Sequence, residues 1–200
     1  MAGGNQASSL QIQYLLLPAT MSSMLKFRSL PLLKIACLAG VLLLSACSPK
    51  YNWREVRGTG APFTVMLPAK PASHARLIDL DGIAVTMTMT AAEVDGVTFA
   101  VGAAALPDTT QSQQALNAMK NGLVRNINGT IREEKSSPAG TTPITITLEA
   151  SSPPTQNSQR LLLARFVAKG EHVYQVIVAG EEQAVSREEA DTFLASFKPD

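Results

Sequence analysis

Apolar and polar side chains alternate strictly through residues 83–91, where Val85, Met87 and Met89 share one side and three threonines share the other. A period of two residues is typical of a β-strand with one buried face. Asp81-Gly82 precedes this stretch and Asp95-Gly96 follows it, and Asp-Gly is a strong signal for a tight hairpin turn. With further strands expected at 63–67, 74–80 and 97–106, residues 63–106 are predicted to form an antiparallel meander.

The remainder of the chain is predicted to add two helices and four strands. The first helix follows Pro107, ends at Asn128-Gly129, and has an apolar stripe made of Leu116, Met119, Leu123 and Ile127. A capping box at Ser186 and Glu189 begins the second helix, whose apolar face is Ala190, Phe193, Leu194 and Phe197. The strands are expected at 130–134, 144–149, 161–167 and 173–178. The fold class predicted is therefore α+β, with an antiparallel β-sheet flanked by two helices.

No intramolecular disulfide can stabilise the body of the chain, because the two cysteines, Cys37 and Cys47, both lie at its beginning. Hydrophobic residues make up 46% of the sequence, which excludes a largely disordered protein. A domain of about 150 residues buries about 68–70% of its unfolded surface, which is enough for one self-sufficient core. We therefore expect a single domain over residues 63–200.

The first 46 residues have the features of an export signal. They contain three basic residues, Lys26, Arg28 and Lys34, and no acidic residue. The apolar run from Ile35 to Leu44 is too short to span a membrane, which takes about 20 residues, but it suits the hydrophobic region of a signal peptide. We therefore expect residues 1–46 to be a cleaved signal peptide, with Met24 as an alternative start.

The sequence Leu44-Ser45-Ala46-Cys47 resembles the bacterial lipobox. That resemblance implies cleavage by signal peptidase II between Ala46 and Cys47, and attachment of lipid to the Cys47 thiol and amine, so that membrane lipid becomes the first partner. Ser48 in place of aspartate after the cysteine implies the outer membrane, with the protein facing the periplasm. The alternative is an ordinary cysteine in an uncleaved anchor.

Residues 47–62 are expected to form a lipid-anchored tether. Pro49, Gly58, Gly60 and Pro62 discourage regular structure, and a flexible segment of this length reaches about 20 Å. The ring of Trp53 has two interpretations. It lies at the lipid headgroup boundary together with Tyr51, or it covers an edge of the core, which we favour.

Several residues that could bind metal have simpler structural explanations. Asp79-Leu80-Asp81-Gly82 resembles the start of a calcium loop, but an EF-hand needs a glutamate at the twelfth position, where this chain has Thr90. Met87 and Met89 are soft ligands suited to copper(I), but the alternation places them in the core. No metal site and no cofactor is predicted.

No catalytic set stands out in the sequence. The only histidines, His74 and His172, are far apart, and no G-x-S-x-G or G-x-G-x-x-G motif occurs. Glu181-Glu182 is expected to be a pair of solvated acids. The formal net charge of +1 argues against a nucleic-acid partner. We therefore predict that the protein is not an enzyme.

The C-terminal run Val173–Gly180, followed by Glu189–Phe197, resembles the closing strand and helix of PsbP-like domains. The opening Phe63–Lys70 resembles their first strand and its proline. This resemblance, over residues 54–199, implies an antiparallel sheet flanked by helices in a compact domain that docks on a larger partner. No binding residue of a known member matches, so no specific function is carried over.

The function predicted is that of a membrane-anchored periplasmic lipoprotein, acting as a non-catalytic binding or assembly accessory module with an envelope protein as partner. One alternative is a periplasmic carrier of a small ligand or metal. The other is an envelope enzyme.

Overall fold

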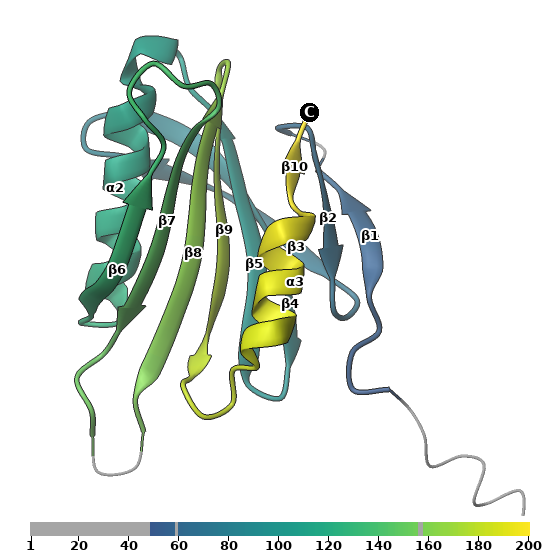
Figure 1. Ribbon diagram of the computed structural model, residues 1–200. Coiled ribbons are helices and arrows are strands. Elements are labelled where there is room, and N and C mark those ends of the chain that lie inside the picture. The colour runs from purple at the N-terminus through teal and green to yellow at the C-terminus, as the bar shows by residue number, and fades with distance from the viewer. Residues whose placement is uncertain (1–48, 59, 156–157) are drawn as a thin grey trace, which may run out of the picture. The chain divides into compact units, whose positions relative to one another are not determined.

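Residues 49–58, 60–155 and 158–200 are described by the structure, a computed structural model, and they form two antiparallel β-sheets and two α-helices (Figure 1). The helices are α2 (Ser112–Asn126), preceded by the 3-10 turn η1 (Thr109–Gln111), and α3 (Arg187–Ser196). The strands are β1 (Arg54–Arg57), β2 (Phe63–Leu67), β3 (Ala72–Asp79), β4 (Ala84–Val94), β5 (Val97–Ala105), β6 (Thr130–Ser136), β7 (Ile144–Ser151), β8 (Arg160–Lys169), β9 (His172–Glu181) and β10 (Lys198–Pro199). The predicted α+β class is confirmed.

Seven strands form the main sheet in the order β3-β4-β5-β9-β8-β7-β6, with every neighbouring pair antiparallel. The predicted meander is confirmed for its last three strands, which pair in sequence order. Its turns are the expected ones, because Asp81, Gly82, Asp95 and Gly96 all have positive φ, as a type I′ hairpin turn requires.

The first strand of the predicted meander lies elsewhere. β2 pairs with β1 and β10 in a separate three-stranded sheet and makes no ladder with β3. Pro68 and Pro71 lie between β2 and β3 and prevent a tight hairpin there. The side chains of Phe63, Val65 and Leu67 are all buried, so β2 packs its apolar side onto the main sheet.

The expectation that residues 48–62 lack regular structure is wrong for Arg54–Arg57, which form β1 against β2. The backbone N–H of Asn52 already donates to the Pro68 carbonyl at 2.7 Å. The ring of Trp53 lies edge-on to Phe99, with 6.2 Å between centroids, and therefore covers an edge of the core as we favoured. The compact unit begins at Pro49 rather than at Phe63.

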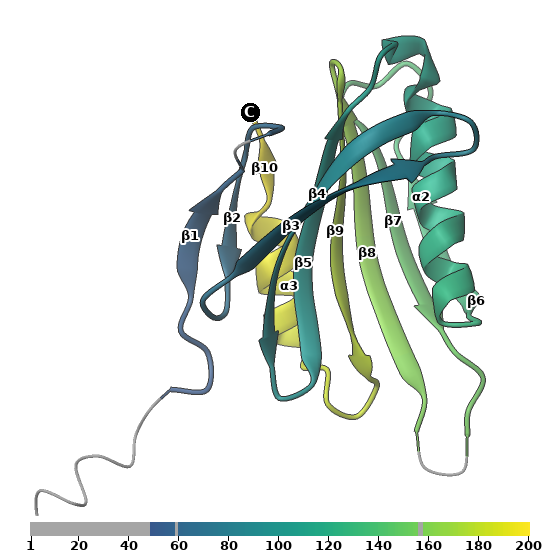
Figure 2. The same ribbon diagram turned by 180° about the vertical axis from the view of Figure 1, so that it is seen from behind.

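Both faces of the main sheet are covered, and each has its own apolar core. α2 packs on one face, against β7, β8 and β9, while α3 and the small sheet pack on the other (Figures 1 and 2). The central strands β5, β8 and β9 are therefore buried along nearly their whole length.

Both helices bury the faces that the sequence predicted. Leu116 and Met119 are buried under α2, and Ala190, Phe193 and Phe197 are buried under α3. The side chain of Ser186 caps α3 by accepting a hydrogen bond from the Glu189 N–H. No helix in the described part of the chain is long and apolar enough to cross a membrane.

Candidate binding site

The residues predicted for cleavage and lipid attachment, Ala46 and Cys47, lie outside the described residues. The residues considered as metal ligands or catalytic groups, His74, His172, Asp79, Met87 and Met89, lie among the described residues.

The histidines are not brought together. His74 lies on β3 and His172 begins β9, with β4 and β5 between these strands. Asp79 forms the hairpin turn, because its carboxylate accepts a hydrogen bond from the Gly82 N–H at 2.7 Å. No cluster of three or more histidine, cysteine or acidic side chains suited to a metal occurs in residues 49–58, 60–155 and 158–200.

A cleft of about 300 Å³ opens between α2 and the β3–β4 hairpin. Gln114, near the start of α2, donates a hydrogen bond to the Asp81 carbonyl at 2.8 Å and thereby holds the hairpin tip to the helix. Met87 of β4 and Met119 of α2 both line the cleft. The lining residues are Ile78, Asp79, Leu80, Asp81, Met87, Ala118, Met119, Gly122, Leu123, Arg125, Asn126 and Gln175.

Gln175 is the polar group of the cleft that lies deepest in the protein, since the residue is only 7% exposed. Its amide Nε2 donates to the Met89 sulfur at 3.4 Å, and a thioether is a weak acceptor. The amide oxygen accepts no hydrogen bond from another side chain or backbone group in the described part of the chain. The oxygen is not a buried atom without a partner, so part of its surface is open to the cleft.

A row of paired residues across the sheet explains how Gln175 reaches Met89. Met89 on β4 is paired with Gly102 on β5, and Gly102 is paired with Gln175 on β9. A Cβ atom at Gly102 would lie 2.6 Å from the Met89 sulfur and 2.7 Å from Cγ of Gln175. The absent side chain therefore leaves the space in which the two side chains meet.

Gly122 is a second glycine with a spatial role at this site. It lies in the body of α2, where glycine costs about 1 kcal/mol relative to alanine. It lines the cleft, and a Cβ atom there would meet no atom within 4 Å. Close packing therefore does not explain this glycine.

Sequence reasoning placed Met87 and Met89 in the core, and this is confirmed, with Met87 buried and Met89 packed against the same cluster. It missed Gln175, Gly102 and Gly122. The glutamine interrupts the apolar run of β9, which was a usable signal, but its neighbours on β4 and β5 depend on strand pairings that only the fold reveals.

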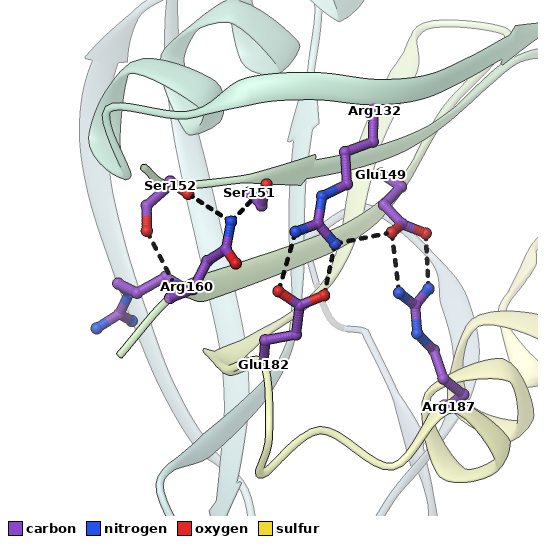
Figure 3. A network of polar contacts seen from close by, with 8 residues as sticks. Arg132, Glu149, Ser151, Ser152, Arg160, Glu182 and Arg187 are labelled. Atoms are coloured by element: carbon purple, nitrogen blue, oxygen red, sulfur yellow. Dashed lines mark hydrogen bonds and ion pairs between the residues drawn. The ribbon is translucent and has the colours of Figure 1, made fainter. Parts of the chain in front are cut away.

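Four charged side chains form a network on the opposite face of the main sheet (Figure 3). Arg187 of α3 donates two hydrogen bonds to Glu149 of β7, at 2.6 and 2.9 Å. Arg132 of β6 donates to Glu182 at 2.9 Å and lies 3.5 Å from Glu149. Glu182 is therefore paired rather than simply solvated as expected. The network fastens α3 and the turn before it to the edge of the sheet.

A β-bulge makes this network possible. The register of β6 against β7 shifts between Ile131 and Glu133, so that Arg132 is the extra residue. A bulge redirects side chains out of the normal alternation. It brings the Arg132 guanidinium beside Glu149, which is paired in the ladder with another acid, Glu133.

The hydrogen bonds from Arg187 hold the pKa of Glu149 below its ordinary value. We expect Glu149→Gln to lower the free energy of unfolding at pH 7 by about 1 kcal/mol, since Arg187 is half exposed and water screens the pair. A carboxylate with a lowered pKa stabilises the fold above its unfolded value, near 4.3, and loses this effect as the pH falls through its folded value. The deficit of the variant should therefore shrink between pH 7 and pH 3 in urea unfolding followed by circular dichroism.

The exposed Glu93 serves as the control for this experiment, and Glu93→Gln should leave stability within about 0.5 kcal/mol of the unaltered protein. An equal deficit for Glu149→Gln at both pH values would show that the ionised carboxylate is not the stabilising group.

No protein-family model matches this chain, and no curated protein matches it in sequence.

Proposed function

We propose that the chain is a lipoprotein, cleaved before Cys47, acylated on that residue and anchored to the outer membrane on its periplasmic side. The lipobox-like Leu44–Cys47 after a basic region and a short apolar run supports this proposal. Ser48, which stands in place of an aspartate after the cysteine, supports location in the outer membrane. A single myristoyl chain gives only marginal binding, so the several chains of a lipoprotein cysteine would make the attachment effectively permanent.

The observation that carries this proposal is the lipobox-like Leu44–Cys47, and the compact unit begins two residues after its cysteine, at Pro49. Two peptide units separate Cys47 from Pro49, and consecutive Cα atoms are about 3.8 Å apart, so these two Cα atoms are within about 8 Å. Lys50 pairs with Asp95 at 3.0 Å, and Tyr51 stacks on Trp53 with 5.9 Å between centroids.

The role that we propose is docking rather than catalysis. A hydrolytic nucleophile needs a base beside it, and in the described residues neither histidine side chain makes a hydrogen bond to a serine or threonine hydroxyl. We also propose that the domain is PsbP-like, and that resemblance implies a compact domain that docks on a larger partner. The cleft at Gln175 also favours a second candidate function, the carriage of a small ligand, because binding pockets begin at about this volume.

The test of the anchor is labelling with radioactive palmitate in a Gram-negative host that expresses the full chain. The unaltered protein is expected to take up label and to fractionate with the membranes, whereas Cys47→Ala should show no label. Cys37→Ala, which removes the other cysteine, is the matched control and should be labelled normally. Labelled Cys47→Ala protein would overturn the proposal.

A further inference from the structure

The two edges of the main sheet differ in how well they are protected. β6, at one edge, has a bulge at Arg132 and a run of charged residues, Arg132–Lys135, and these are features that keep other strands from pairing. β3, at the other edge, pairs with β4 in unbroken register over all eight residues. No strand in the described part of the chain covers its outer side, and Leu77 on it is 76% exposed. The outer N–H and C=O groups of β3 are therefore available to another strand.

The open edge of β3 leads to the cleft at Gln175. Ile78 and Asp79, the last two residues of β3, line the cleft together with α2. Figure 2 shows β3 crossing the sheet with its end beside α2. A strand added to β3 would therefore bring one of its side chains to the mouth of the cleft, because alternate residues of a strand share a face.

The cleft presents hydrogen-bond acceptors at the end of aliphatic walls. The oxygen of Gln175 has no donor in the described residues, and the carboxylate of Asp81 makes no ion pair there. At the hairpin end the charged residues are Asp79 and Asp81, whereas Arg125 lies in the last turn of α2. A side chain with an aliphatic stem and a cationic end matches this arrangement, and lysine has that form.

From these observations we infer that β3 and the cleft bind an extended segment of a partner protein, which adds as a strand to β3 and places a lysine side chain between Met119 and Met87 toward Gln175 and Asp81. Strand addition gives affinity through main-chain hydrogen bonds, and a pocket for one side chain gives specificity. This inference rests on the proposed docking function and names the surface and the partner's chemistry.

The test uses the protein purified in detergent from cells that express the full chain. The probe is the peptide acetyl-Thr-Val-Thr-Lys-Thr-Val-Thr-amide, titrated by calorimetry and by hydrogen exchange. We expect saturable binding and at least tenfold slower exchange of β3 amides, with β6 unchanged. A peptide with norleucine in place of lysine keeps the stem without the charge and should bind about tenfold more weakly. A peptide with N-methyl groups on alternate residues should not bind.

Two variants and a matched control test the residues. Asp81→Asn keeps a residue that tolerates the positive φ of the turn and should weaken binding of the lysine peptide about tenfold. Gln175→Met should do the same, because it removes the amide and keeps the volume. Asp95→Asn makes the same change in the other Asp-Gly turn, at similar φ, and should leave binding unchanged.

Absence of binding, equal binding of the norleucine peptide, or binding without protection of β3 would each overturn the inference, and the last result would point to a small-cation site instead. The lipid anchor plays no part in this assay. If the protein is labelled normally with palmitate but does not bind the peptide, only the proposed peptide site is overturned. If the protein binds the peptide but takes up no palmitate, only the proposed lipid anchor is overturned.

Discussion

Replacing Phe193 with alanine is expected to lower the free energy of unfolding by about 3–5 kcal/mol, the range for truncating a buried aromatic side chain. Phe193 is fully buried at the centre of α3, and its ring lies edge-on to Phe99 of β5 with 5.5 Å between centroids. Truncation removes this contact and leaves a cavity within the core cluster that also contains Phe197 and Val178. Guanidinium denaturation followed by circular dichroism should show a lower midpoint with an unchanged slope.

The exposed Leu77 is the control for this prediction, and Leu77→Ala should change stability by no more than about 0.5 kcal/mol. A loss below about 1 kcal/mol for Phe193→Ala would mean that α3 is not packed on the main sheet as described.

The second large effect is expected on the other face of the sheet, where Leu116→Ala should lower the free energy of unfolding by about 2–5 kcal/mol. Leu116 is fully buried between α2 and the main sheet. Because both cores share the same strands, loss of one should unfold the other in a single transition. Trp53 reports on the far core through its contact with Phe99, so its fluorescence should change together with the circular dichroism.

Separate transitions for the fluorescence and the circular dichroism of Leu116→Ala would contradict this single cooperative unit. Asn121 on the same helix is exposed, so Asn121→Ala is a suitable control on α2 and should change stability by no more than about 0.5 kcal/mol.

Local patterns predicted most of the elements. The alternation at Val85 and Met87, the Asp-Gly turns and the apolar stripes of both helices each depend on residues close together in the chain, and the structure confirms them. The assembly of the elements depends on distant pairings. The alternating sequence of β2 is typical of a strand, but no residue near it in the chain indicates that it pairs with Arg54–Arg57 and with Lys198–Pro199.

The candidate site could not be predicted from the sequence for the same reason. Gly102 and Gln175 are remote in the chain and become neighbours only because β5 pairs with β9. The bulge at Arg132 is equally hidden, since the residues of β6 are all exposed and show no alternation that an extra residue would visibly break.

The mass of the intact protein recovered from the membranes of its native host tests the central claim most directly. We predict a chain that begins at Cys47 and carries additional mass equal to a diacylglycerol and an acyl chain, with fragmentation placing all of it on that first residue. A chain that retains the residues before Cys47, or that starts there with an unmodified thiol, would contradict the proposed anchor and the periplasmic docking role built on it.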